Sequence, residues 1–244
     1  AVTICPHLTR MRCRCGAKSP APAALPNGHL AMLKLWGRVN SSNVKKVRWT
    51  CAELDIPYER IDAGLHFGVV DSDEYRAMNP NGMIPVIDDD GFVLWESNAI
   101  VRYLCAKHPK APYWPADLRT RAAADRWMDW QCTTIGPQIG PPFMQLIRQP
   151  QSEWDLAMIK RNITRAGELW HIVDRQLGQT KWLAGDDFTM GDVPLGILAY
   201  TWMELPLDKV GLEHCRPRLA NVWRWYEQLQ AMKNYRDIVA IGLT

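Results

Sequence analysis

The fold is decided by the stretch Asn79-Pro-Asn-Gly-Met-Ile-Pro-Val-Ile-Asp-Asp-Asp-Gly-Phe-Val-Leu-Trp-Glu-Ser-Asn-Ala-Ile100. It predicts two short strands joined by a tight turn at Asp90-Gly91, and then a helix start. Pro85 opens the first strand, a position where a missing backbone N–H is tolerated. Glu96 and Ser97 place an acid and a hydroxyl at the helix N-terminus, which favours anions. The segment therefore predicts a binding site for a small peptide that carries a carboxylate.

The composition is that of an ordinary globular protein. The chain has 244 residues, and 47% of them are hydrophobic, which suffices for one large or two modest domains. No segment approaches the roughly 18 apolar residues that span a membrane. Four of the 29 basic residues lie in the first thirty positions, so the rest of the chain is nearly neutral. We therefore expect neither a membrane nor a nucleic-acid partner.

Residues 1–31 are predicted to be a tail or leader without a functional role, because they contain four prolines and no hydrophobic periodicity. The alternatives are an arginine-rich transit peptide and a metal site built from Cys5, His7, Cys13 and Cys15. Cys-x-Cys lacks the two-residue gap typical of zinc sites, so no metal is expected. The other cysteines fall on apolar helix faces, which predicts reduced thiols in a cytoplasmic protein.

Residues 32–107 alternate between strand and helix patterns and predict an α/β domain of the thioredoxin-like type, in the order βαβαββα. The helix over 44–54 has apolar residues three and four positions apart, and it follows the first strand after a polar loop. The predicted elements are strands at 33–37, 58–61, from 85 and at 92–95, and helices at 44–54, 73–77 and 97–107.

Residues 108–118 form a proline-rich linker, and strand patterns disappear after it. Residues 119–244 therefore predict an all-α helical-bundle domain. Glycines and prolines at 136–142 predict a break after the first of its helices. The stretch Thr189–Asp192 is a capping box that starts a later helix. The predicted helices are 119–135, 153–177, the one running to 204, and 219–232.

Together these segments resemble the cytosolic glutathione transferase family, and within it the bacterial serine-type, theta-like enzymes. The resemblance runs from Leu33 to the C-terminus and is carried by four stretches: 38–44, 79–85, 95–100 and 189–192. It implies that glutathione is the co-substrate and lies along the thioredoxin-like domain. It also implies a pocket for a small hydrophobic electrophile formed with the helical domain, a homodimer, and a role in detoxification.

The resemblance implies specific contacts for glutathione. Glu96 would bind the γ-glutamyl ammonium, and Ser97 with the helix N-terminus would bind the γ-glutamyl carboxylate. The backbone of Ile84, before Pro85, would pair with the cysteinyl backbone as an added strand. Met83 stands where relatives often carry a basic residue that meets the glycyl carboxylate, so that anchor must differ here.

Two further contacts are implied outside this segment. His66 is the first candidate to replace the missing glycyl anchor, with Arg38 and Lys45 as alternatives. Asp125 matches a family position that reaches the glutathione of a neighbouring subunit. The alternative for Asp125 is a salt bridge on the helix surface.

Catalysis requires a thiolate, and a free thiol with a pKa of about 8.5 is only slightly ionised at neutral pH. A hydroxyl at the start of the first helix stabilises that anion. The resemblance places the catalytic serine at Ser41, by a count that assumes no gap. Ser42 and Asn43 remain alternative donors, and either could instead cap the helix.

The sequence therefore predicts a glutathione transferase that activates the thiol for attack on small apolar electrophiles. One alternative is a glutathione-dependent dehalogenase, isomerase or peroxidase on the same site. Another is a binding module of the same fold without catalytic activity. The loop at 38–44 contains no cysteine, so the disulfide-reducing, cysteine-type relatives are poor models.

Overall fold

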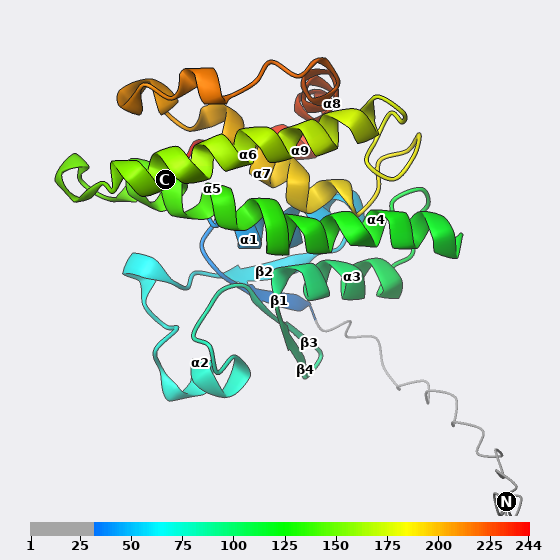
Figure 1. Cartoon of the computed structure of the whole chain (residues 1–244). Coiled ribbons are helices and arrows are strands. Elements are labelled where there is room, and N and C mark those ends of the chain that lie inside the picture. The colour runs from blue at the N-terminus through cyan, green and yellow to red at the C-terminus, as the bar shows by residue number, and fades with distance from the viewer. Residues whose placement is uncertain (1–31) are drawn as a thin grey trace, which may run out of the picture. The chain divides into compact units, whose positions relative to one another are not determined.

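Four strands pair into one mixed sheet in the computed structural model, which describes residues 32–244 (Figure 1). The sheet order is β2-β1-β3-β4, in which β1 pairs parallel with β2 and antiparallel with β3, and β3 pairs antiparallel with β4. The strands are β1 (Leu33–Trp36), β2 (Tyr58–Ile61), β3 (Val86–Asp89) and β4 (Phe92–Trp95). The predicted tail at 1–31 and its alternative metal ligands Cys5, His7, Cys13 and Cys15 lie outside the described residues.

Three α-helices accompany the sheet: α1 (Ser42–Glu53), α2 (Asp73–Met78) and α3 (Ser97–Lys107). A short 3₁₀ turn, Leu65–Phe67, lies between β2 and α2. In Figure 1, α1 and α3 lie between the sheet and the later helices, whereas α2 lies away from them. The observed order confirms the predicted βαβαββα thioredoxin-like fold.

The rest of the described chain is helical, which confirms the predicted second fold class. Its helices are α4 (Leu118–Trp130), α5 (Gly136–Phe143), α6 (Leu156–Leu177), α7 (Asp192–Glu204), α8 (Ala220–Ala231) and α9 (Lys233–Ile238). Two π-helical turns, Gln131–Ile135 and Met144–Arg148, flank α5. Short 3₁₀ turns lie at Gln151–Glu153, Leu207–Val210 and Glu213–Cys215. Of the described helices, none is long and apolar enough to cross a membrane.

The predicted break at 136–142 is wrong, because helical backbone continues from α4 to Arg148. Pro141 and Pro142 lie inside α5 and lack the N–H that an α-helix needs. The π-helical turns on both sides absorb this loss by shifting hydrogen bonds to residues five apart, as between the Gly136 N–H and the Gln131 carbonyl. A Cβ on Gly136 would come within 2.6 Å of that carbonyl oxygen, so the turn requires glycine.

The main hydrophobic core is continuous from the sheet into the helical part. Trp49 of α1 is fully buried, and its ring packs against Phe188 and against Tyr235 of α9. The sequence pattern predicts a last helix that ends at 232, and the structure adds the short helix α9 after it. A second, smaller core lies on the other face of the sheet, where Tyr75 of α2 packs with Val86.

Half of the predicted capping box is present. Asp192 accepts from the Thr189 N–H, but Gly191, not Thr189, is the N-cap of α7, and no side chain of the described residues caps the helix. The Asp192 carboxylate also makes hydrogen bonds in the core. Asp192 is fully buried, and one of its carboxylate oxygens accepts hydrogen bonds from the backbone N–H of Leu183 and the indole N–H of Trp225. The other oxygen accepts from the backbone N–H and the hydroxyl of Thr189. One carboxylate therefore joins the start of α7 to the 183 loop and to α8.

We expect Asp192→Ala to lower the free energy of unfolding by at least about 3 kcal/mol, because three buried N–H groups would lose their acceptor. Chemical denaturation measures this change. Asp187→Ala is the matched control, since Asp187 lies exposed in the preceding loop and should change stability by less than about 0.5 kcal/mol. Equal effects of the two substitutions would contradict the role given to Asp192.

Candidate functional site

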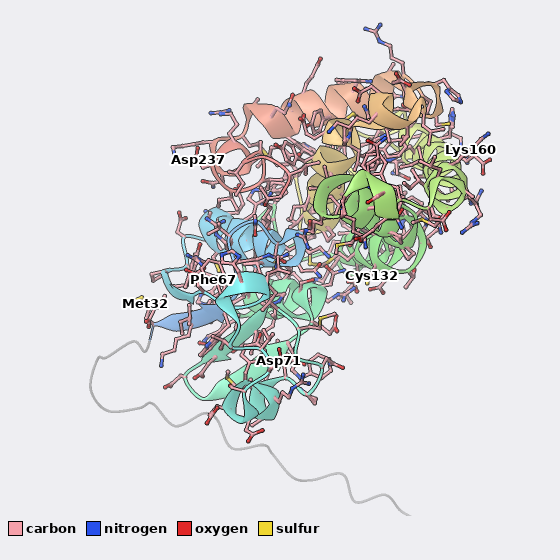
Figure 2. The ribbon with its side chains drawn as sticks, turned by 90° about the vertical axis from the view of Figure 1, so that its left-hand side faces the viewer. Met32, Phe67, Asp71, Cys132, Lys160 and Asp237 are labelled. Atoms are coloured by element: carbon pink, nitrogen blue, oxygen red, sulfur yellow. The ribbon has the colours of Figure 1, made fainter. Side chains whose placement is uncertain are left out.

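A cleft of about 520 Å³ lies at the N-terminal ends of α1 and α3. Its walls come from five segments that are far apart in the sequence: the β1–α1 loop, the loop after β2, the 79–85 loop, the start of α3, and the second π-helical turn. The loop after β2 carries Phe67, which is labelled in Figure 2. The lining residues are Arg38, Ser41, Asn43, Gly64, Leu65, Val70, Asn79, Gly82, Met83, Ile84, Pro85, Glu96, Ser97, Met144 and Arg148.

The start of α1 brings two of the three predicted catalytic candidates into the cleft. Ser41 is the N-cap residue and is only 7% exposed, but its side chain makes no capping hydrogen bond. Asn43 also lines the cleft, and its Oδ1 accepts a hydrogen bond of 3.3 Å from Ser97 Oγ. Ser42 is exposed and is not among the lining residues. Among residues 32–244, the Ser41 hydroxyl makes no capping hydrogen bond and so remains available as a donor beside a helix N-terminus.

The start of α3 is held in an unusual backbone conformation. Glu96 has φ +71° and ψ +106°, a region that residues with a side chain rarely adopt. Ser97 is the first residue of α3, and the backbone N–H groups of the first helical turn have no acceptor within the helix. Glu96 and Ser97 therefore present a carboxylate, a hydroxyl and free N–H groups to the same cleft.

The 79–85 loop forms the wall between these two helix ends. The Ile84–Pro85 peptide bond is cis, and both residues line the cleft. In the described chain, the backbone N–H and C=O of Ile84 make no hydrogen bond. The Met83 carbonyl accepts from the Tyr75 hydroxyl at 2.9 Å and from Asn79 Nδ2 at 2.8 Å. The side chains of Tyr75 and Asn79 thus fix the loop at the Met83 carbonyl. The Ile84 backbone remains available to pair with a ligand.

Three residues named from the sequence, His66, Lys45 and Asp125, are not among the residues that line the cleft. His66 is exposed and stacks on Phe67, and Lys45 donates to the Val239 carbonyl at 2.9 Å. Asp125 forms an ion pair with Arg102 of α3. This ion pair is the surface salt bridge given above as the alternative role of Asp125. The contact of Asp125 with the glutathione of a neighbouring subunit stays a prediction.

Two arginines, Arg38 and Arg148, also line the cleft. Arg38 is 7% exposed, and its Nε makes no hydrogen bond within the described residues. Burial and the nearby positive charge of Arg148 lower the pKa of Arg38. Arg148 donates from Nε and Nη2 to the Thr244 carbonyl at 3.2 and 2.9 Å. These two arginines therefore bring positive charge to the cleft.

The lining residue Arg148 was not predicted from the sequence; Met144, of the same π-helical turn, lines the cleft as well. They reach the cleft only because the helix continues through its prolines to the second π-helical turn. The predicted break at 136–142 would have separated these residues from the preceding helix. No local pattern in the sequence distinguishes Arg148 from a surface arginine. Lys46, which lies directly behind Ser97, was also missed.

The comparison with known proteins assigns the family. A family model, the N-terminal domain of glutathione S-transferase, matches residues 31–106. Glutathione S-transferase GstB of Escherichia coli K12 is 41% identical over 215 residues, which cover 87% of this chain and 100% of that protein. The chain belongs to the glutathione S-transferase family. The predicted family resemblance is thereby confirmed.

Solved structures of this enzyme family agree. A theta class glutathione S-transferase from Xanthomonas axonopodis pv. citri, solved with glutathione bound, is 41% identical, with a TM-score of 0.81. The match covers 87% of this chain and 99% of that one. Glutathione transferase F2 of Populus trichocarpa is 27% identical, with a TM-score of 0.76, and the match covers 86% of this chain and 98% of that one.

The strained backbone of Glu96 gives a test of the site. We expect Glu96→Gly to leave the free energy of unfolding unchanged or to raise it by up to about 1 kcal/mol, because glycine adopts positive φ without steric cost. Chemical denaturation provides the measurement. In the control, Glu59→Gly on the exposed side of β2, stability should fall by about 1 kcal/mol. A larger loss in Glu96→Gly than in Glu59→Gly would show that the Glu96 backbone is not strained.

Proposed function

We propose that this member of the family is a glutathione transferase that binds glutathione in the cleft and attacks small electrophiles with its thiolate. One observation carries the proposal: Ser41, the Ile84 backbone and the Glu96-Ser97 pair, which are far apart in the sequence, line the same cleft. These groups match an activated thiol, a peptide backbone and a γ-glutamyl end. The bound glutathione in the Xanthomonas relative supports the same assignment.

The start of α3 is the proposed receptor for the γ-glutamyl end. Its ammonium would pair with the Glu96 carboxylate. Its carboxylate would accept from the free N–H groups of the first turn and from Ser97 Oγ, whose proton would turn to it from Asn43 Oδ1. The backbone of the cysteinyl residue would pair with the unpaired N–H and C=O of Ile84. Among the three candidate anchors for the glycyl carboxylate, Arg38 is favoured because it alone lines the cleft.

Ser41 is the proposed catalytic residue. Its hydroxyl would donate to the glutathione sulfur, so that the thiol loses its proton to solvent and the thiolate persists. Lowering the thiol pKa by one to two units requires about 1.4 to 2.7 kcal/mol, the strength of one or two hydrogen bonds to an anion. The thiolate then forms the carbon–sulfur bond as the leaving group departs with its electron pair. Asn43 remains the second candidate donor, through its Nδ2.

Leu65 and Met144 line the same cleft as Ser41 and would supply apolar surface for the small electrophile, and Arg38 and Arg148 line that cleft as well. The pocket would hold the electrophile near the thiolate, which raises the rate by proximity. A homodimer is also part of the proposal, on the strength of family membership. Dehalogenation, isomerisation or peroxide reduction on the same thiolate would differ only in the electrophile, and no contact in the cleft favours one of them.

Thermal melting tests the binding step. We expect millimolar glutathione to raise the melting temperature, because a ligand that binds only the folded state stabilises it by mass action. A stabilisation of about 2.7 kcal/mol corresponds to a concentration one hundred times the dissociation constant. An equimolar mixture of free glutamate, cysteine and glycine is the control and should cause no shift. Equal melting curves with and without glutathione would argue against the proposal.

The catalytic assignment is tested with Ser41→Ala and an activated aryl chloride as electrophile. We expect kcat/KM to fall by a factor of about 10² or more, because the thiolate loses its hydrogen-bond donor. The thiolate absorbance of bound glutathione should then titrate nearer a pKa of about 8.5. Ser42→Ala is the matched control, since this neighbouring serine lies outside the cleft. If Ser42→Ala impaired the reaction and Ser41→Ala did not, the assignment would be reversed.

A further inference from the structure

Lys46 is a buried cation placed directly behind the proposed γ-glutamyl receptor. It lies on α1, is 4% exposed, and does not line the cleft. Its Nζ donates to Ser97 Oγ at 3.4 Å and to Gln131 Oε1 at 3.0 Å. Ser97 Oγ in turn donates to Asn43 Oδ1. Lys46 thus holds the Ser97 hydroxyl that lines the cleft, in a chain of hydrogen bonds that runs from Gln131 in the first π-helical turn through Lys46 and Ser97 to Asn43.

The positive charge of Lys46 has no direct counter-charge in the described residues. Both hydrogen-bond acceptors are neutral, and no carboxylate forms an ion pair with Lys46. The titratable groups that act on it are Cys132, in the π-helical turn after α4, and Glu96, at the start of α3. Cys132 is labelled in Figure 2 on the helical part of the chain.

Burial dominates the energetics of this ammonium. It lowers the pKa of Lys46 to about 8, and Cys132 and Glu96 only partly oppose the effect. A buried charge of this kind is costly unless an opposite charge comes near. An anion bound at Ser97 Oγ would lie at most roughly 6 Å from Lys46 Nζ, the sum of the 3.4 Å separation and an ordinary hydrogen bond. That distance is short enough for a strong interaction in a buried setting.

We propose that Lys46 is a positioning residue for glutathione, which fixes the Ser97 hydroxyl and supplies the positive charge behind the γ-glutamyl carboxylate. This inference rests on the proposed function. It explains why a helix face that packs into the core carries an ammonium at this position. It also makes glutathione binding depend on the protonation of a group that the ligand does not touch.

The direction of the pH dependence follows from linkage. Below pH 8 Lys46 is protonated in the free protein, so its contribution to binding is complete. A bound carboxylate raises the pKa of Lys46, so above pH 8 the complex takes up a proton that the free protein has lost. Affinity therefore falls as the pH rises through 8, and it levels off above the raised pKa of the complex.

S-methylglutathione is the probe, because it keeps the γ-glutamyl end and has no thiol to ionise. Calorimetric titrations at pH 7 and pH 9.5 give the dissociation constant, and buffers of different ionisation enthalpy give the proton uptake. Lys45→Met is the matched control, because Lys45 is the adjacent buried lysine and its pKa is also lowered to about 8, chiefly by burial. Its Nζ bonds to the Val239 carbonyl, away from the cleft.

We expect Lys46→Met to weaken binding at pH 7 by about tenfold, which corresponds to about 1.4 kcal/mol. Between pH 7 and 9.5, the unaltered chain and Lys45→Met should lose more affinity than Lys46→Met does. Both should also take up protons on binding near pH 8.5. Lys46→Met should lack this component. Lys46→Arg keeps its charge at all these pH values, so it should bind at pH 7 and also lack the pH-dependent loss.

Circular dichroism confirms that each variant is folded, and Lys46→Arg serves if Lys46→Met does not fold. The same pH dependence in Lys46→Met, Lys46→Arg and Lys45→Met would overturn the role of Lys46 while leaving glutathione binding intact. A failure of the unaltered chain to bind S-methylglutathione at either pH would overturn the proposed function, and this inference with it.

Discussion

Helix α1 is enclosed by α3, α7 and α9, and this enclosure constrains the rest of the structure. Residues on nearly every side of the helix are buried, including Trp49 at the centre of the core. Its N-terminus is the end that opens onto the cleft, so Ser41 stands on a rigid support. The same enclosure forces two consecutive lysines into the interior. Lys45 reaches the chain near α9, and Lys46 reaches the start of α3.

The cleft combines one part that is built locally and another that depends on distant segments. The 79–97 region supplies the Ile84 backbone and the Glu96-Ser97 pair within a single hairpin and helix start. The opposite wall depends on the helix that passes through its prolines by means of two π-helical turns. Because the helix continues through this region, Met144 and Arg148 reach the cleft. A broken helix would leave that side without a wall.

Much of the fold was predictable because its elements are short and well marked. Asp90-Gly91 marked the hairpin, and the Thr189–Asp192 stretch marked the start of a buried helix, although of its two capping bonds only the one from the Thr189 N–H to Asp192 formed. The errors came from rules that hold for isolated segments. Prolines end helices unless wider turns absorb the missing N–H, and the short helix α9 is stabilised by packing of Tyr235 against Trp49. Neither effect leaves a periodic pattern in the sequence.

The sequence by itself determined the order of elements, the family resemblance and the candidate groups Ser41, Ile84, Glu96 and Ser97, because these depend on local patterns and on motif spacing. Only the tertiary structure decided which candidates share a cleft. It placed His66 and Lys45 away from the cleft, and it placed Lys46 behind Ser97. Burial and distance between remote segments fix the charge around a site, and these quantities exist only once the chain has packed.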